Sequence, residues 1–154
     1  MPVYEIVPGL VIHAQELAAN MSVADKREMW ALANVSPHEA ISECLRVSRD
    51  TKTGLADGRV VCMFGIIPPS TILSDLHTPW LLGTNLLPKY AKTFLRLSRT
   101  YFAGMKGATP HMVNYVDARH TAAKRWLTWL GFTLDPATPY GVEGLPFHRF
   151  EMRA

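Results

Sequence analysis

The stretch from Val113 to Phe132, VNYVDARHTAAKRWLTWLGF, constrains the fold more than any other part of the sequence. Its start is rich in β-branched and aromatic residues, which predicts a buried strand over 112–116. Apolar residues then recur at intervals of three and four, which predicts an amphipathic helix. Asp117 suits the cap that begins this helix, and Gly131 suits the left-handed position that ends it. The residues predicted to face the core are Ala122, Trp126, Trp129 and Leu130. A strand that leads directly into a helix is a common place for ligands in α/β proteins.

A hairpin occupies the middle of the chain. Asp57-Gly58 is a two-residue turn sequence whose positive φ angles suit paired strands, and the strands it predicts cover 51–56 and 59–67. The second of them is nearly all apolar, which predicts a central strand covered on both faces. The other predicted elements are a strand over 3–7, helices over 11–20, 22–32 and 36–49, a strand over 79–84, a helix over 88–106 that Gly107 ends, and strands over 133–135 and 145–152 with a loop over 136–144 between them. Ser36 and Glu39 suit a capping box at the start of the helix over 36–49. This order indicates one α/β domain over residues 1–154 with a mixed sheet.

The composition narrows the class of protein. Hydrophobic residues make up 48% and charged residues 19% of the 154 positions, which excludes a disordered chain. No apolar run is long enough to span a membrane, and the N-terminus does not resemble a signal peptide. The net charge of +3 permits a phosphate-bearing ligand, but a solvated basic face explains it better, so nucleic acid is not indicated. The two cysteines do not form a disulfide framework.

Motifs for other chemistries are missing from the sequence. The six histidines include no pair at i,i+4, so no metal site is expected. The sequence also has no G-x-S-x-G, no G-x-x-x-x-G-K-S/T and no G-x-G-x-x-G pattern.

The strand and helix at 113–132 resemble a segment of the GNAT-type N-acetyltransferases, which reads V-x-x-x-N-x-x-A-x-x-L-Y-x-x-x-G-F. The positions that match are Val116, Ala123, Gly131 and Phe132. His120 stands where the pattern has Asn, and Leu127 where it has Tyr. The resemblance implies a single-domain GNAT-like α/β fold, with a mixed, mostly antiparallel central sheet flanked by helices.

The same resemblance implies a site for acetyl-CoA between two parallel strands, here 80–84 and 112–116. The residues that would bind this cofactor are Leu81, Leu82, Gly83, Thr84, Asn85 and His120. The pyrophosphate of CoA rests in such proteins on an R/Q-x-x-G-x-G/A loop, at the start of the next helix. Residues 84–88 hold no glycine here, and Pro88 lacks an N–H donor.

The resemblance also bears on catalysis. Leu127 replaces the tyrosine that protonates the leaving thiolate, and leucine cannot donate a proton. The candidates for a general base are Asp117, Glu143 and His77, because an amine must be neutral to accept an acyl group. Asp117 suits a helix cap equally well. His120 either bonds the pantetheine arm or the substrate, or it is an exposed residue of the first helical turn.

A second resemblance covers roughly residues 36–152. The segments DGRVVCMFGI, PWLLGTNLL, FLRLSRTY and PYGVEGLPFHRFEM, with the stretch at 113–132, are similar to the internal virion protein A family of short-tailed bacteriophages. This likeness implies a non-catalytic protein that helps to assemble the internal virion core. Its partners would be phage structural or assembly proteins, and its location the host cytoplasm during infection or the virion itself. The alternative is an acetyl-CoA-dependent N-acetyltransferase that acts on an amine of a protein or a small molecule. The two substitutions and the missing glycine loop favour the assembly role.

Overall fold

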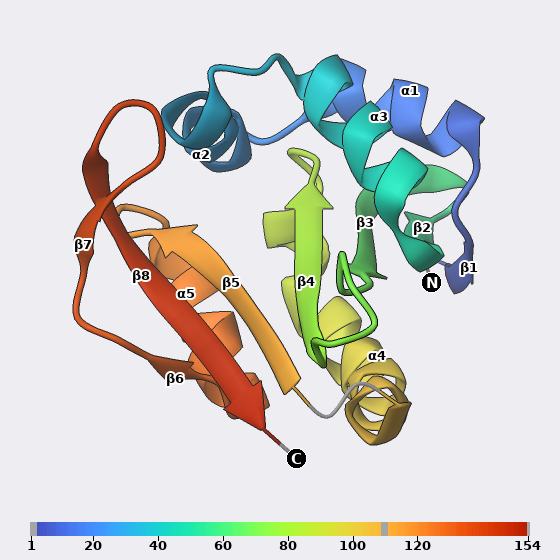
Figure 1. Cartoon of the computed structure of the whole chain (residues 1–154). Coiled ribbons are helices and arrows are strands. Elements are labelled where there is room, and N and C mark those ends of the chain that lie inside the picture. The colour runs from blue at the N-terminus through green and yellow to red at the C-terminus, as the bar shows by residue number, and fades with distance from the viewer. Residues whose placement is uncertain (1–2, 109–110, 154) are drawn as a thin grey trace.

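An eight-stranded sheet forms the centre of the molecule, in the order β1-β2-β3-β4-β5-β8-β6 with β7 paired to β8 (Figure 1). The computed structural model describes residues 3–108 and 111–153, without the side chains of 105–108. The strands are β1 (Tyr4–Pro8), β2 (Arg49–Ala56), β3 (Arg59–Ile67), β4 (Leu76–Gly83), β5 (His111–Asp117), β6 (Thr133–Leu134), β7 (Thr138–Tyr140) and β8 (Leu145–Arg153). Among the described strand pairs, all are antiparallel except β4 with β5.

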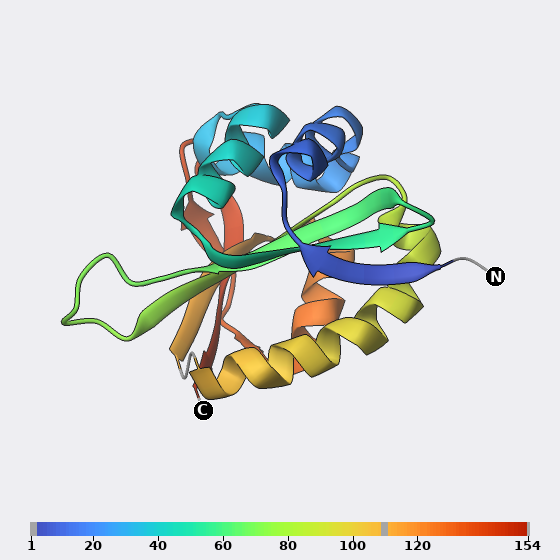
Figure 2. The ribbon, with the colours of Figure 1, turned by 90° about the vertical axis from the view of Figure 1, so that its right-hand side faces the viewer.

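Helices cover both faces of this sheet, as Figure 2 shows. One face carries α1 (Val11–Asn20), α2 (Val23–Ala33) and α3 (Pro37–Val47), and the other carries α4 (Leu87–Ala108) and α5 (Thr121–Leu130). In β3, every residue from Val60 to Ile66 is buried, because both faces of this strand are covered. The expected fold, a mixed and mostly antiparallel sheet flanked by helices, is confirmed.

Short-range signals in the sequence place several turns and helix ends correctly. Asp57 and Gly58 have φ angles of 50° and 78°, as a tight hairpin turn requires. Ser36 and Glu39 cap α3 reciprocally: Ser36 Oγ accepts the Glu39 N–H at 3.2 Å, and Glu39 Oε1 accepts the Ser36 N–H at 3.1 Å. Gly131 ends α5 with a φ of 103°.

Removing the cap should weaken the fold by a measurable amount. Ser36→Ala is expected to lower the free energy of unfolding by about 1 kcal/mol, because the Glu39 N–H loses its ordered acceptor, Ser36 Oγ. Urea denaturation measures this difference. Ser42→Ala, at an exposed position of the same helix, is the matched control and should leave stability unchanged or slightly higher. Equal stability of Ser36→Ala and the native protein would contradict the assigned cap.

Several predicted boundaries are wrong. β4 begins at Leu76, three residues before the predicted start, because Leu76 and His77 pair with β5 and Thr78 already pairs with β3. α4 continues through Gly107 to Ala108, so this glycine does not end the helix. The segment 136–144, which we expected to be a loop, contains β7, whose residues pair with β8.

The start and the buried face of α5 also differ from the prediction. His120 caps the helix by accepting the Ala123 N–H, whereas Asp117 is the last residue of β5. Leu127 is 5% exposed and faces the core. Trp129 is 45% exposed, and the Arg99 guanidinium lies 4.3 Å from the centre of its indole ring. Trp129 therefore has the spacing of three and four residues that is typical of a core position, although it faces solvent and is stabilised there by a cation.

Candidate functional site

β4 and β5 pair only at their N-terminal ends and then separate. Leu76 lies opposite His111 and His77 opposite Met112, and no further pair joins the two strands within the described residues. Figure 1 shows them diverging toward their C-terminal ends, where α2 lies. The resemblance placed a cofactor between these two strands, and the gap between them is the candidate site.

Helix α2 bridges the open end of the gap. Asp25 Oδ2 accepts the Gly83 N–H at 2.9 Å, at the end of β4. Glu28 Oε1 accepts the Asp117 N–H at 3.0 Å, at the end of β5. The two carboxylates lie three residues apart and so project from one face of the helix. Both residues are buried, Asp25 at 4% and Glu28 at 8% exposure, so the mouth of the gap contains two desolvated acids.

His120 joins the two acids from the opposite side. Its Nε2 lies 3.0 Å from Asp25 Oδ1 and 3.9 Å from Glu28 Oε2. Its Nδ1 accepts the Ala123 N–H at 3.3 Å, so Nε2 carries the proton of the neutral ring and donates it to Asp25. Burial lowers the pKa of His120, but the hydrogen bond to Asp25 and the surrounding carboxylates outweigh burial and raise it. Protonation of Nδ1 would break the helix cap.

The pKa of Glu28 is far above the usual range of a glutamate. Burial raises the pKa of Glu28 to about 7, although His120 and the Asp117 N–H act in the opposite direction. A carboxylic acid with this pKa gains and loses a proton near neutral pH, which suits general acid–base chemistry.

Asp117 does not share this behaviour. Burial raises its pKa, but the Arg119 side chain outweighs burial and holds it below its usual range. Arg119 donates two hydrogen bonds to this carboxylate, from Nη2 to Oδ2 at 2.7 Å and from Nε to Oδ1 at 3.0 Å. An acid that is ion-paired in this way is a poor proton acceptor.

Near the paired end of the strands, Asn114 crosses the gap. Its Nδ2 donates to the Pro79 carbonyl at 2.8 Å, and its Oδ1 accepts the Tyr115 N–H at 2.8 Å. Side chains therefore connect β4 and β5 at two levels, with Asn114 at one end and the α2 carboxylates at the other.

Leu81 lies between these two levels, and its backbone faces the gap. Residues of an antiparallel pair alternate between those that exchange bonds with the partner strand and those that do not. The Thr84 N–H bonds the Val61 carbonyl at 2.9 Å. In this register Leu81 and Pro79 belong to the set that points away from β3. Because β4 and β5 have already separated, neither ladder gives the Leu81 N–H a partner among the described residues.

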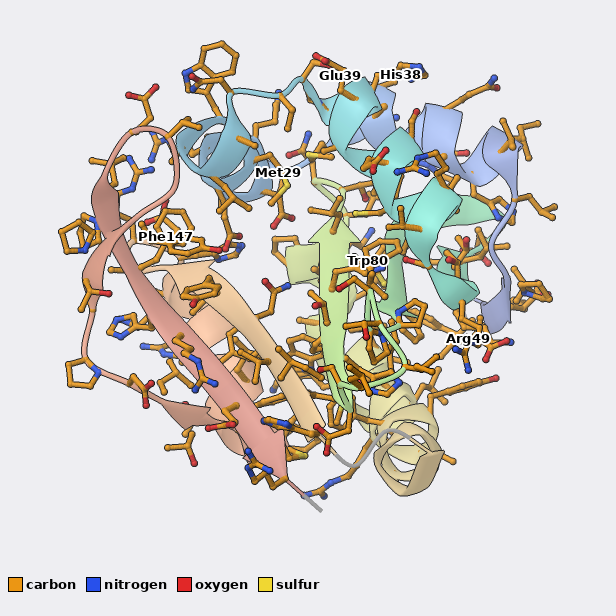
Figure 3. All side chains as sticks on the ribbon, viewed as in Figure 1. Met29, His38, Glu39, Arg49, Trp80 and Phe147 are labelled. Atoms are coloured by element: carbon orange, nitrogen blue, oxygen red, sulfur yellow. The ribbon has the colours of Figure 1, made fainter. Side chains whose placement is uncertain are left out.

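A small apolar cavity of about 50 Å³ lies beside this edge. Leu81 and Trp80 line it from β4, and Phe94, Trp126 and Leu127 line it from the helices. Figure 3 shows Trp80 beside β4, and its indole N–H donates to Ser48 Oγ at 2.6 Å. The Trp126 Nε1–H is buried and has no partner within the described residues. A cavity of this volume accommodates a group of a few atoms.

The remaining predicted cofactor residues are distributed around the turn after β4. Leu82 is buried, and its backbone faces β3 by the same alternation. Gly83 bonds Asp25. Thr84 is 1% exposed, and its hydroxyl donates to the Val60 carbonyl at 2.8 Å. Asn85 is exposed. The cofactor assignment of Leu81, Leu82, Gly83, Thr84, Asn85 and His120 stays a prediction, and among these residues Leu81 and His120 face the gap most directly.

The other two candidate bases lie elsewhere. Glu143 is in the turn between β7 and β8, where its Oε1 accepts a bond from Asn34 Nδ2 at 2.9 Å. His77 lies at the paired end of β4, and its Nδ1 is 2.8 Å from the Asp75 carbonyl. Neither contacts the Asp25–Glu28–His120 cluster through a hydrogen bond or ion pair of the described residues.

Sequence reasoning missed Asp25 and Glu28. Both lie in a predicted helix, where an acidic pair at i,i+3 is usually solvated. The one available signal was Ser22, whose hydroxyl donates to Asp25 Oδ2 at 2.8 Å and thereby fixes the acid at the start of the helix. Asp25 and Glu28 are more than ninety residues away from His120 in the sequence, so no local sequence pattern predicts that they are in contact.

The cluster also has the composition of a metal site, which the sequence did not predict. Asp25, Glu28 and His120 each offer a ligand atom, all within 4.8 Å of one another. Two carboxylates and one imidazole suit a divalent cation such as Zn²⁺. Binding through His120 Nε2 would move the ring proton to Nδ1 and break the bond to the Ala123 N–H, so the observed hydrogen bonding fits proton exchange better.

Solved structures share this architecture. A GNAT-family acetyltransferase from Streptococcus pneumoniae is similar over 99% of this chain and 100% of its own, with a TM-score of 0.65 and 12% identity. Ribosomal-protein-alanine N-acetyltransferase from Brucella melitensis covers 97% and 99%, with a TM-score of 0.71 and 12% identity. The protein yncA from Salmonella typhimurium, solved with its cofactor acetyl-CoA, covers 97% and 93%, with a TM-score of 0.66 and 15% identity.

Sequence comparison adds nothing to this likeness, since no protein-family model and no curated protein matches the chain. None of the described helices is both long and apolar enough to cross a membrane. The likeness extends over nearly the whole of each chain at TM-scores of 0.65 and 0.71, and it identifies the architecture: the chain has a GNAT-like α/β fold.

Proposed function

We propose that the protein transfers a short acyl group, such as acetyl, from a thioester to an amine. One observation carries this proposal: an open backbone edge at Leu81 lies in the same gap as Glu28, an acid whose pKa is about 7. Acyl transfer to an amine needs a place for the thioester and a group that accepts the proton of the amine. The proposal is supported further by the fold, which yncA shares in complex with acetyl-CoA.

The edge of β4 would hold the donor. The Leu81 N–H can donate a hydrogen bond to a carbonyl in the arm of the thioester. The arm would then pair with β4 as an added strand does. The apolar cavity beside Leu81 has a volume of about 50 Å³, which favours a short acyl chain over a long one. The bound donor supplies an acyl group activated as a thioester.

Glu28 would accept the proton of the attacking amine. As the C–N bond forms and the C–S bond breaks, the amine loses one proton and the sulfur leaves as a thiolate. Glu28 takes up that proton, and Asp25 and the Asp117 N–H hold His120 and Glu28 in place. The same proton can then neutralise the thiolate, a role that Leu127 cannot fill.

The direct test is thiol release that depends on an amine. The protein is incubated with acetyl-CoA and, separately, with spermidine, lysine, a peptide with a free N-terminus and buffer alone. Free thiol is followed by a chromogenic reagent and the acetylated amine by mass spectrometry. At least one amine should increase thiol release above the rate without amine. Equal rates with and without every amine, at millimolar acetyl-CoA, would count against the proposal.

The second candidate is a non-catalytic binding protein, the role implied by the likeness to the internal virion protein family. The observation that favours it is Leu127, which lies in the core at the place of a proton-donating tyrosine. The comparisons support the acetyltransferase reading at the level of the fold and give the phage assembly role no support. An amine-dependent reaction in the assay above would reject the non-catalytic reading.

A further inference from the structure

The turn between β4 and α4 has no N–H group left for an anion. In the GNAT fold this turn is where the diphosphate of CoA would bind, and helix N-termini bind phosphates through free N–H groups. Here every N–H from residue 83 to residue 87 has an acceptor inside the protein. The acceptors are Asp25 Oδ2 for Gly83 (2.9 Å), the Val61 carbonyl for Thr84 (2.9 Å), the Asn20 carbonyl for Asn85 (3.0 Å), Thr84 Oγ1 for Leu86 (3.2 Å) and the Thr84 carbonyl for Leu87 (3.1 Å).

The next two positions of α4 add no free donor. Pro88 has no N–H, and the Lys89 N–H bonds the Leu86 carbonyl at 3.1 Å. The Lys89 ammonium lies 5.3 Å from the centre of the Tyr90 ring, over the side chain of its own helix. The turn therefore lacks the free backbone N–H groups with which a helix N-terminus holds a phosphate.

The charge at the mouth of the gap points the same way. Asp25 sits on the Gly83 N–H, where the resemblance placed part of the cofactor. A carboxylate at this point repels a diphosphate, and burial of Asp25 weakens the screening of that repulsion by salt. The Leu87 side chain fills the space next to the Gly83 Cα, because a Cβ added to this glycine would lie 2.6 Å from Leu87 Cδ2.

The part of the gap that would receive the pantetheine arm is different. Leu81 keeps an N–H without a partner in either neighbouring strand, and the apolar cavity lies next to it. The residues present therefore fit an acyl group on a pantetheine arm and do not fit the nucleotide end of CoA.

We infer that the donor is recognised through its acyl-pantetheine arm alone, so that an acyl-pantetheine without the nucleotide binds as well as the CoA thioester. This inference rests on the proposed acyl transfer. It narrows the substrate class to thioesters of pantetheine, whether the arm is free, part of CoA or attached to a larger carrier.

Calorimetric titration of the full chain with CoA, pantetheine and adenosine 3′,5′-bisphosphate tests the inference without measuring activity. We expect CoA and pantetheine to bind with dissociation constants within about threefold of each other, and the bisphosphate not to bind or compete. A protein that holds the diphosphate by two charge-assisted bonds would prefer CoA by ~100-fold or more. CoA binding at least tenfold tighter than pantetheine, or competition by the bisphosphate, would overturn the inference and leave the proposed function standing.

Asp25→Asn removes the charge, and its amide oxygen can still accept the Gly83 N–H. Its NH2 group takes the place of the oxygen that accepts the His120 Nε2–H, so both affinities can change and the readout is their ratio. The variant should tighten CoA binding relative to pantetheine binding by a few-fold, since only the nucleotide end is charged. Equal changes for both ligands would contradict the role given to the Asp25 charge. If neither CoA nor pantetheine binds at millimolar concentration, the proposed function and the inference fail together.

Discussion

At pH 8, the Glu28→Gln variant is expected to be more stable than the native protein by up to about 3 kcal/mol, and at pH 4 the two should be equally stable. Burial raises the pKa of Glu28 in the folded protein from 4.5 to about 7. Below pH 4.5 the acid is protonated in both the folded and the unfolded chain, so it adds nothing to the difference. As the pH rises to about 7, the unfolded chain releases the proton while the folded chain retains it, and folding becomes less favourable.

Glutamine keeps the useful contact and removes the charge. Its amide oxygen can accept the Asp117 N–H in place of Glu28 Oε1. Urea denaturation at pH 4, 6 and 8 measures the effect. Glu143→Gln is the control, because Glu143 is exposed in the turn after β7 and the change should stay within ~0.5 kcal/mol at each pH. A Glu28→Gln variant that is less stable than the native protein at pH 8 would contradict the buried, destabilised acid.

The same variant separates catalysis from folding. If Glu28 accepts the amine proton, Glu28→Gln should lower kcat by roughly 10²-fold or more and remove the rise in rate around pH 7. The variant is then more stable and less active, so the loss cannot be ascribed to unfolding. An unchanged kcat with an unchanged pH profile would exclude Glu28 as the base.

Leu81→Pro is expected to weaken binding of acetyl-pantetheine by about 10-fold to 100-fold with the fold intact, because the substitution removes the N–H that faces the gap. Proline is tolerated here for a specific reason: Pro79, two residues earlier, occupies the same set of positions in the strand. The pairing with β3 does not use the Leu81 N–H, so this ladder stays complete. Calorimetric titration measures the change in affinity.

Two control variants separate the effect of the N–H from that of the side chain. Leu81→Ala keeps the N–H and shortens the side chain that lines the cavity, so it should weaken binding less than Leu81→Pro. Leu82→Pro removes an N–H directed at β3 and should cost about 3 kcal/mol of stability. Equal affinity of Leu81→Pro and Leu81→Ala would place the donor elsewhere.

The sequence predicts the fold well where the signal is local. The turn at Asp57-Gly58, the cap at Ser36 and the glycine after α5 are each determined by the conformations of adjacent residues, and each lies where it was expected. The prediction was wrong where tertiary contacts decide. Trp129 has the spacing of a core residue but lies at the surface under Arg99, and β7 forms only because β8 lies beside it.

The candidate site was predictable in part for the same reason. The strand over 112–116 and His120 follow from the resemblance of one contiguous stretch, and the position of the strand over 79–84 beside them follows from the GNAT-like fold that the resemblance implies. Asp25 and Glu28 could not be predicted in this way, because they belong to the site only through their contacts with Gly83 and Asp117, which are distant in the sequence. The absence of glycines at 84–88 indicated a poor diphosphate site, and the bonds within the turn now supply the physical reason.

The amide resonance of Leu81 reports directly on whether this edge of β4 binds the donor. It can be observed in a protein labelled with ¹⁵N-leucine and assigned by its loss in Leu81→Pro. Titration with acetyl-pantetheine should shift this resonance until the site is saturated, because the N–H gains an acceptor on binding. The Leu87 amide, which already bonds the Thr84 carbonyl, should move little. A Leu81 resonance that stays in place at millimolar donor would contradict the central claim that this edge of β4 binds an acyl thioester.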